Sequence, residues 1–207
     1  GRVKSVDART AGALQKEGWI ILDVRPPAEV SRAGVGGVVA VPVYVEEGWE
    51  GLGAYLKHAS WFGMGGWWLG GAHMKPNDAF LADVLAAIPL ASAPRIVVAC
   101  QKGLRSLAAA EQLARAGYAD LAWVTGGLDS AAPGDLTVVG APDLRYGGIG
   151  GLSAALGMTD VQREGRAGGG GPSRTLLVGA LALLAADGVW FLATTGRELL
   201  EKGSEGP

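Results

Sequence analysis

The sequence predicts an α/β protein built on a largely parallel sheet, with one transmembrane helix near its carboxyl end. The sheet is predicted because short apolar, β-prone runs alternate with amphipathic helical segments, an order typical of parallel strands covered by helices on both faces. The helix is predicted by the apolar run Thr175–Thr195, which is bounded by Arg174 and Arg197. The fold class therefore joins a globular α/β domain to a membrane anchor.

The composition narrows the classes of function. With 207 residues and 49% apolar positions, the chain is long enough for one substantial core plus appendages. A formal net charge of −2 gives no reason to expect a nucleic-acid partner. One cysteine excludes an intramolecular disulfide, and its sequence distance from the two histidines argues against a Cys/His zinc site. We therefore expect no metal, no cofactor and a free thiol, as in a reducing compartment.

The first half of the chain predicts two helices and two strands. Val6–Gly18 has the pattern of a short helix, and Trp19–Val24 that of a buried strand. Val38–Val43 predicts a second strand, although Pro42 weakens its end because proline cannot donate to a sheet. Asn77 is expected to cap a helix whose apolar residues recur at three- and four-residue spacing and which ends before the proline at 89.

The sequence around the only cysteine combines a strand, a turn and a helix. Ile96–Val98 brings the backbone to Cys100, and the alanine-rich helix that follows ends at Gly117. Leu121–Thr125 predicts the next strand. Cys100 is therefore expected at the carboxyl end of a parallel strand, where ligands bind in open α/β sheets.

The six residues 100–105, Cys-Gln-Lys-Gly-Leu-Arg, carry the strongest chemical signal. Backbone N–H groups of a strand-to-helix loop can converge on the sulfur, and the helix N-terminus adds partial positive charge. Lys102 and Arg105 add full charges that favour the nucleophilic thiolate. Gly103 permits a positive φ angle, and Ser106 supplies a hydroxyl or caps the helix. The alternative is an inert buried cysteine that ends a strand.

Four segments resemble, in the right order, the motifs of the rhodanese-like domain family. They are LDVRPPAEV (22–30), VPV (41–43), VVACQKGLRS (97–106) and GYADLAWVTGGLDS (117–130). The resemblance covers roughly residues 3–135. It implies a rhodanese-like domain with a parallel five-stranded sheet flanked by helices, in which Cys100 carries a persulfide sulfur.

The resemblance also implies roles for residues around the cysteine. The residues implied to form the loop and bind the anion are Gln101, Lys102, Gly103, Leu104, Arg105 and Ser106. Asp23 and Arg25 would brace this loop from the neighbouring strand end, or would instead form a purely structural ion pair.

Loop length distinguishes two reactions within this fold. The related phosphatases and arsenate reductases have one residue more between Cys and Arg, which widens the cradle for a tetrahedral oxyanion. The shorter loop here therefore favours sulfur transfer over phosphate hydrolysis. The chain departs from the family at Ala33-Gly34-Val35, where Gly-His-Ile is common, and we interpret the missing histidine as drift at a structural position.

The largest departure is an insertion, residues 46–76, that replaces a short connection. It holds four of the seven tryptophans: Trp49, Trp61, Trp67 and Trp68. So long a loop usually carries function. The tryptophans either cover one edge of the sheet or contact lipid headgroups or a membrane protein, and Trp61, Trp67 and Trp68 are the candidates for that contact. His58 and His73 are expected to be solvated.

Beyond the domain, residues 1–135, the sequence predicts a glycine-rich linker at 136–173, too rich in glycine for a core. A transmembrane helix at 174–197 and a short polar tail at 198–207 follow. The apolar run would rise about 31 Å as a helix, enough to cross the hydrocarbon of a bilayer. Asp187 lies near its middle and is expected to face protein, because a carboxylate is costly in lipid. The alternative is a buried helix of a soluble fold.

With the insertion and the anchor included, the chain resembles the plastid rhodanese-like proteins of plants and green algae. The resemblance implies a chloroplast thylakoid location, a stromal domain and a photosystem-type membrane complex as partner. Two functions are consistent with it. In the first, a membrane-anchored sulfurtransferase carries sulfur on Cys100 between a small sulfur donor and an acceptor. In the second, the domain is a non-catalytic docking or assembly module of that complex; a phosphatase is a distant third.

Overall fold

The computed structural model describes residues 3–48, 50–69, 73–157 and 159–166. The chain divides into two compact units, residues 1–155 and 156–207. The first unit contains the sheet and the cysteine loop, and the description below concerns it unless stated otherwise. The domain boundaries expected from the sequence stay a prediction.

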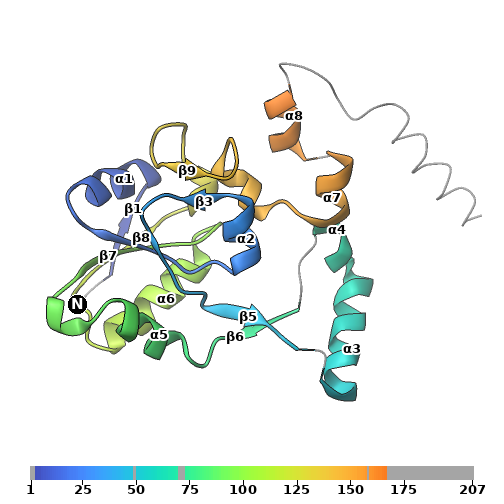
Figure 1. The fold of residues 1–207 in the computed structure, drawn as a ribbon, viewed down its shortest axis with the longest axis horizontal. Coiled ribbons are helices and arrows are strands. Elements are labelled where there is room, and N and C mark those ends of the chain that lie inside the picture. The colour runs from blue at the N-terminus through green and yellow to red at the C-terminus, as the bar shows by residue number, and fades with distance from the viewer. Residues whose placement is uncertain (1–2, 49, 70–72, 158, 167–207) are drawn as a thin grey trace, which may run out of the picture. The chain divides into compact units, whose positions relative to one another are not determined.

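Five parallel strands form the central sheet in the order β1-β8-β7-β2-β4 (Figure 1). They are β1 (Lys4–Val6), β2 (Ile20–Asp23), β4 (Val39–Ala40), β7 (Arg95–Ala99) and β8 (Asp120–Val124). Leu22 of β2 is aligned with Val98 of β7 on one side and with Val39 of β4 on the other. The parallel five-stranded sheet implied by the resemblance is therefore present.

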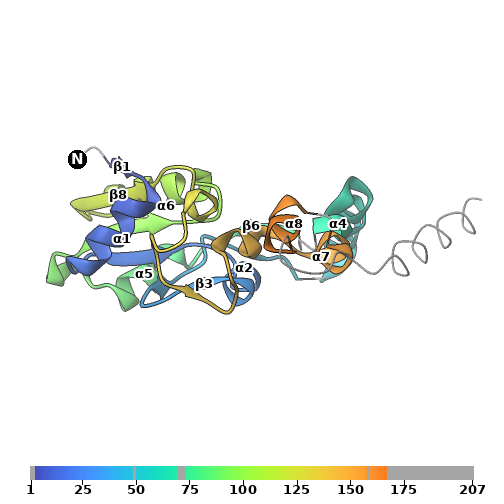
Figure 2. The same cartoon turned by 90° about the horizontal axis from the view of Figure 1, so that it is seen from above.

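The edge strand β1 differs from the sequence-based expectation, which placed Val6 in the first helix. Lys4–Val6 pairs with residues 122–124 of β8, and Figure 2 shows the two strands side by side. The helix begins only after Asp7, whose carboxylate accepts the N–H of Thr10 at 2.7 Å. A strand of three residues offers too short a pattern to be read from sequence.

Helices cover both faces of the sheet because its strand residues alternate between two cores. Leu22, Ile96 and Val98 pack with α5 (Phe80–Ala87) and α6 (Leu104–Arg115) on one face. Ile21, Val97 and Ala122 pack on the other face with α1 (Ala8–Lys16). Figure 1 shows α1 and α5 on opposite sides of the sheet. Each buried Val, Leu or Ile side chain contributes about 1.5–3 kcal/mol to folding.

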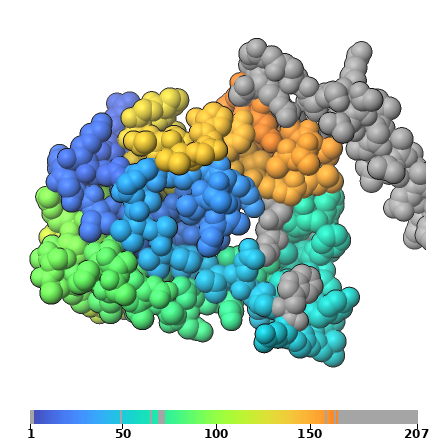
Figure 3. All heavy atoms as spheres, in the orientation of Figure 1, coloured from blue at the N-terminus to red at the C-terminus, as the bar shows by residue number. Residues whose placement is uncertain are grey.

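The segment after β8 packs on the domain, although its glycine content predicted a linker without core residues. Leu136 and Leu144 are buried in the core on the α1 face. Strand β9 (Val138–Val139) pairs antiparallel with β3 (Gly34–Val35). Figure 3 shows this part of the chain, in yellow, against the blue N-terminal part. Widely spaced apolar residues among glycines are thus sufficient to anchor residues 136–144.

The insertion is organised by a hairpin and a helix where the sequence predicted a loop. Strands β5 (Tyr44–Glu46) and β6 (Met74–Pro76) pair antiparallel. Between them lie α3 (Gly51–Trp61), a π-helical turn (Phe62–Gly66) and α4 (Trp67–Leu69). Glycine is a poor helix former, so helix propensity does not predict a helix in this glycine-rich segment.

A carboxylate at the end of the hairpin holds α3. Glu47 Oε1 accepts a hydrogen bond from Lys57 Nζ at 2.9 Å, and its Oε2 lies 2.7 Å from His73 Nδ1. The Nε2 of His58 lies 3.0 Å from the Glu47 carbonyl oxygen. His58 is buried, so the expectation that it is solvated is wrong. His73 is partly buried against the same carboxylate.

The remaining α-helices in the described part of the chain are short. They are α2 (Pro27–Arg32), α7 (Gly151–Leu156) and α8 (Asp160–Arg166). Before α8, the Thr159 N–H donates to Gln162 Oε1 at 3.3 Å, and the Gln162 N–H donates back to Thr159 Oγ1 at 3.4 Å. This reciprocal pair is a capping box that defines the start of α8.

The fold class predicted from the sequence requires one correction. It combined the five-stranded sheet with a transmembrane helix over residues 174–197, which lie outside the described residues. Among the described residues, no helix is long and apolar enough to cross a membrane. The longest of them, α6, has 12 residues and rises about 18 Å, against about 30 Å of hydrocarbon. Over the described residues the structure supports the α/β fold with its parallel five-stranded sheet.

The Glu47 contacts predict that α3 depends on pH. The hydrogen bond from Lys57 lowers the pKa of Glu47, burial opposes it, and the charges of Lys57 and His73 lower the pKa further. Because the folded pKa lies below the ordinary value of 4.5, the stabilisation is complete above pH 4.5 and is lost as the pH falls through the folded pKa. Amide exchange of α3, corrected for intrinsic rates, should therefore accelerate at pH 3.

The variant Glu47→Gln should show that faster exchange of α3 already at pH 7, with little further change on acidification. Glu46→Gln, on the neighbouring carboxylate, is the matched control and should behave as the wild type. Equal exchange of α3 in wild type and Glu47→Gln would show that this carboxylate does not hold the helix.

Candidate functional site

The only cysteine lies where a buried strand ends and a helix begins. Cys100 follows β7 directly, and α6 starts at Leu104. Its Sγ accepts the backbone N–H of Gly103 at 3.1 Å and that of Ser106 at 3.3 Å. The thiol donates to Ser106 Oγ at 3.4 Å, and that hydroxyl donates to the Gly103 carbonyl at 2.7 Å. Donors at a helix N-terminus therefore converge on the sulfur and favour negative charge there.

Two glycines allow the loop to close tightly. Gly103 has a φ angle of +97°, which an L side chain rarely adopts. Gly127, after β8, has a φ of +67°, and a Cβ there would overlap the carbonyl groups of Cys100 and Gln101. Next to it, the N–H of Leu128 donates to the Cys100 carbonyl at 2.8 Å. The turn after β8 thus supports the cysteine loop from a neighbouring strand.

The second loop residue faces the interior instead of the sulfur. The Gln101 amide nitrogen donates to Asp129 Oδ1 at 2.6 Å and to the Leu144 carbonyl at 2.9 Å. Its amide oxygen accepts a hydrogen bond from Arg25 Nη1 at 2.8 Å. Gln101 is buried, so its side chain ties the loop to three other segments and does not offer a donor to an anion above Cys100.

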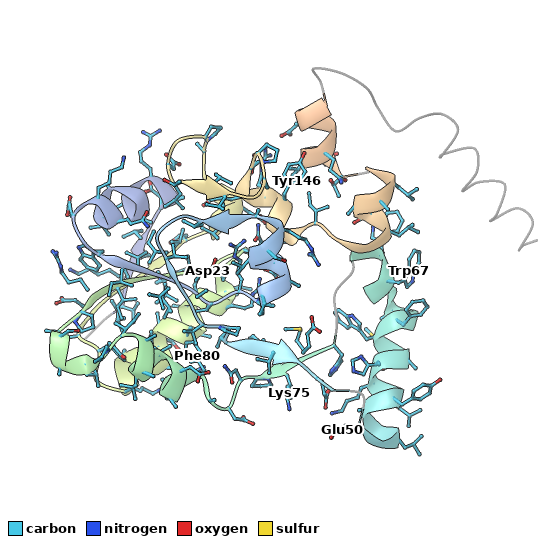
Figure 4. All side chains as sticks on the ribbon, in the orientation of Figure 1. Asp23, Glu50, Trp67, Lys75, Phe80 and Tyr146 are labelled. Carbon is cyan, nitrogen blue, oxygen red and sulfur yellow. The ribbon has the colours of Figure 1, made fainter. Side chains whose placement is uncertain are left out.

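Asp23 and Arg25 form a fully buried ion pair that reaches the loop through Gln101. Arg25 Nη2 lies 2.7 Å from Asp23 Oδ2, and Arg25 Nε donates to both carboxylate oxygens at 3.0 Å. Arg25 Nη2 also donates to the Ala33 carbonyl at 2.9 Å. Figure 4 shows Asp23 inside the domain, near α2. The pair contacts the loop through the hydrogen bond from Arg25 to Gln101.

Arg105 is engaged by a carboxylate that sequence reasoning missed. Its Nη1 and Nη2 donate to the two carboxylate oxygens of Glu29, on α2, at 2.9 and 2.7 Å. Burial lowers the pKa of Arg105, but the hydrogen bonds and charge of Glu29 outweigh it, and the nearby Cys100 adds a smaller upward effect, so the pKa is raised. The guanidinium therefore remains charged beside Cys100 while it is held in place by Glu29.

A pocket of about 430 Å³ opens above the cysteine. Its lining combines the Cys100 loop, α2, the start of α6 and the ends of the insertion. The lining residues are Pro26, Ala28, Glu29, Arg32, Glu46, Trp61, Met74, Cys100, Gln101, Lys102, Leu104, Arg105 and Gly148. Cys100 is buried among its protein neighbours yet lines this space, so a ligand in the pocket can reach it.

Some of the other predicted site residues line this pocket and others do not. Lys102 and Leu104 are exposed on its lining, and Leu104 is 79% exposed. Trp61 lines the pocket. Trp67 and Trp68 pack edge to face with ring centroids 5.7 Å apart and do not line it. Asp187 lies outside the described residues, and the contact with membrane or partner stays a prediction.

Sequence reasoning missed Glu29, Asp129 and Met74. Glu29 and Asp129 lie within the quoted motifs LDVRPPAEV and GYADLAWVTGGLDS, so their presence was visible but their contacts were not. Met74 gave no signal, because a methionine near glycines is typical of neither a core nor a site. The contacts of all three residues join chain segments that are distant in sequence and meet only in the folded domain.

Comparison with known proteins identifies relatives. A family model described as a rhodanese-like domain matches residues 7–132. The chain is 42% identical over 193 residues to rhodanese-like domain-containing protein 11, chloroplastic, of Arabidopsis thaliana, a match covering 92% of this chain and 65% of that protein's length. It is 39% identical over 158 residues to rhodanese-like domain-containing protein 10 of the same plant, covering 75% of this chain and 73% of that protein.

A solved structure is also similar. The rhodanese-like domain of an Anabaena protein, determined by NMR, matches with a TM-score of 0.44 and 17% identity. The match covers 68% of this chain and 81% of that domain's chain.

The buried ion pair predicts a large difference between two arginines. Arg25→Met should lower the free energy of unfolding by about 3–5 kcal/mol, because it leaves the Asp23 carboxylate buried without a counter-charge. Arg9→Met is the matched control: Arg9 lies 3.6 Å from Asp135, but its side chain is 83% exposed, so the cost should stay near 0.5 kcal/mol. Denaturant unfolding measures both.

Removing both charges shows whether Arg25→Met loses stability because the Asp23 carboxylate is left unpaired or because the hydrogen bonds of Arg25 are lost. The double variant Asp23→Leu with Arg25→Met should recover part of the stability, because no uncompensated charge remains. Equal costs for Arg25→Met and Arg9→Met would contradict the role assigned to the buried pair.

Proposed function

The chain belongs to the rhodanese-like domain family, and we propose that it is a sulfurtransferase that carries sulfane sulfur as a persulfide on Cys100. The observation that carries this proposal is the convergence of the Gly103 and Ser106 N–H groups on Cys100 Sγ, at a helix N-terminus and beside a pocket. The same groups stabilise a thiolate before the reaction and an anionic persulfide after it.

Loading would begin with attack of the Cys100 thiolate on the sulfane sulfur of a donor such as thiosulfate. A bond forms between Sγ and that sulfur, the sulfur–sulfur bond of the donor breaks, and sulfite leaves with the electron pair. The charged guanidinium of Arg105 beside Cys100 is placed to attract such an anion. No oxidant or reductant is needed, because sulfur is exchanged between two nucleophiles.

The contacts of the sulfur also favour sulfur transfer over phosphate hydrolysis. Two loop N–H groups already donate to Sγ itself, so they fit a single sulfur atom. A phosphatase cradle needs donors for the oxygens of a bound tetrahedral anion. The short loop between Cys100 and Arg105 therefore supports the sulfurtransferase.

A relative named as chloroplastic supports a plastid location for this chain. A thylakoid location, a stromal domain and a photosystem-type partner stay predictions. Because the chain spans 65% of that relative's length, the activity and partners of the whole protein are proposals as well.

The surface of α3 favours a second function, docking to another protein. Leu52 is 75% exposed and Met64, in the turn after α3, is 82% exposed. The other large exposed apolar residues on this segment are Tyr55, Leu56, Trp61, Phe62 and Trp67. Contiguous exposed apolar surface is typical of interaction sites. If docking is the function, Cys100→Ser will leave binding to the partner protein unchanged. Polar substitutions at Leu52 and Leu56 will abolish that binding.

The proposed persulfide has a direct mass signature. Wild-type protein exposed to thiosulfate and then desalted should gain the mass of one sulfur, and Cys100→Ser should gain none, because the chain has no other thiol. Intact-mass measurement shows the added sulfur, and a second measurement after addition of cyanide should show that it has been removed. Equal mass gains for wild type and Cys100→Ser would rule out the sulfurtransferase.

The Arg105–Glu29 pair predicts a charge effect on donor use. Arg105→Ala leaves the Glu29 carboxylate unpaired at the pocket, so kcat/KM for thiosulfate should fall about tenfold to a hundredfold. The melting temperature should change little, because both side chains are partly exposed. The double variant Arg105→Ala with Glu29→Gln should recover part of the rate. An unchanged kcat/KM with a much lower melting temperature would assign Arg105 a structural role instead.

A further inference from the structure

One wall of the cysteine pocket comes from the insertion and is apolar. Trp61 is the last residue of α3, and Met74 is the first residue of β6. Both line the pocket together with Leu104, with Ala28 of α2 and with Pro26, the residue before that helix. The insertion thus supplies part of the space that a substrate enters.

The size and charge of the pocket indicate an organic molecule. At about 430 Å³ it lies in the range of pockets that hold organic ligands, far above what a small inorganic anion fills. The Arg105 and Glu29 charges compensate each other at 2.7 Å, and Arg32 donates to the Gly147 carbonyl at 3.4 Å. The remaining charged lining residues, Lys102 and Glu46, have opposite signs. The lining thus holds three cations and two carboxylates, a net charge of +1, so an organic ligand would find apolar contact beside a small positive charge.

The Trp61 indole is held in position by its neighbours. Its ring packs edge to face on His73, with centroids 6.4 Å apart and planes at 83°. His73 in turn lies 2.7 Å from Glu47 Oε2, and the same carboxylate binds Lys57 of α3. Trp61 is 39% exposed, so part of the ring is open to a ligand. A pre-positioned aromatic side chain loses little freedom when a ligand packs against it.

We propose that Trp61 and Met74 are specificity-determining residues, which select as sulfur acceptor a small organic thiol with an aromatic or other apolar body. The inference rests on the proposed function, because it concerns discharge of the Cys100 persulfide. The acceptor thiol gives its proton to the terminal sulfur of the anionic persulfide and attacks that same sulfur with the electron pair it retains. A bond forms between the two sulfurs, the bond to Cys100 Sγ breaks, and the electron pair remains on Sγ as the thiolate. The acceptor leaves as an organic persulfide.

Two thiols of similar acidity test the selection. Protein loaded with thiosulfate is desalted and mixed with phenylmethanethiol or with 2-mercaptoethanol, and loss of one sulfur is followed by intact mass. Wild-type protein should discharge to phenylmethanethiol at least about tenfold faster, the factor expected for burying much of a phenyl ring. Trp61→Ala should bring the ratio close to one, and Met74→Ala should reduce it partly.

The control variants distinguish a pocket effect from a general one. Trp67→Ala removes an exposed tryptophan that does not line the pocket, and the ratio should stay at the wild-type value. Trp61→Phe keeps an aromatic ring and should retain most of the preference, even if Trp61→Ala perturbs α3. Loading by thiosulfate should be unchanged in Trp67→Ala. The discharge ratio of each Trp61 and Met74 variant is measured on protein that already carries the persulfide, so it does not depend on the loading rate.

The outcomes separate this inference from the proposed function. If no variant forms a persulfide, the sulfurtransferase itself fails. If the persulfide forms but wild-type protein discharges to both thiols at equal rates, or if Trp61→Ala keeps the preference, the specificity role is wrong. Discharge to a small protein dithiol that is faster than to either organic thiol, and unaffected by Trp61→Ala, would likewise overturn it.

Discussion

Arg25 lies beneath the Cys100 loop with its guanidinium group out of contact with water. A buried charge of this kind is tolerated only when it is paired and fully hydrogen-bonded, and here the donors reach Asp23, the Ala33 carbonyl and Gln101. Gln101 then extends the network to Asp129. The end of β2, the end of α2, the cysteine loop and the turn after β8 are therefore fixed by one cation. The loop that presents the sulfur has little freedom to open without exposing that charge.

Most of the sheet was predictable because its physical signals are local. A strand that is apolar on both faces, followed by a turn and an amphipathic helix, predicts β7, the loop and α6 from one short stretch. The edge strand β1 escaped, because a strand of three residues that is mostly exposed has no periodicity to detect. Residues 136–144 escaped for a related reason: Leu136 and Leu144 are too far apart among glycines to look like a core.

The site was predictable in its residues and not in its contacts. The spacing from Cys100 to Arg105 identified the loop, but nothing local indicates that Glu29 engages the arginine or that Gln101 faces inward. These contacts join residues 76 positions apart in sequence, and single-sequence reasoning has no access to such pairs. Trp61 shows the same limit, because a tryptophan among glycines in a long insertion carries no local sign of the pocket that it lines.

The hairpin at the base of the insertion has a consequence for how this domain can diversify. Glu46 and Met74 are paired, so the chain leaves the domain and returns to it at adjacent positions. The entropy of closing such a loop grows only with the logarithm of its length, about 0.6 kcal/mol for each doubling. Segments of different length can therefore be exchanged between β5 and β6 without retuning the parallel strands. The insertion that forms one wall of the pocket can therefore change during evolution while the cysteine loop stays the same.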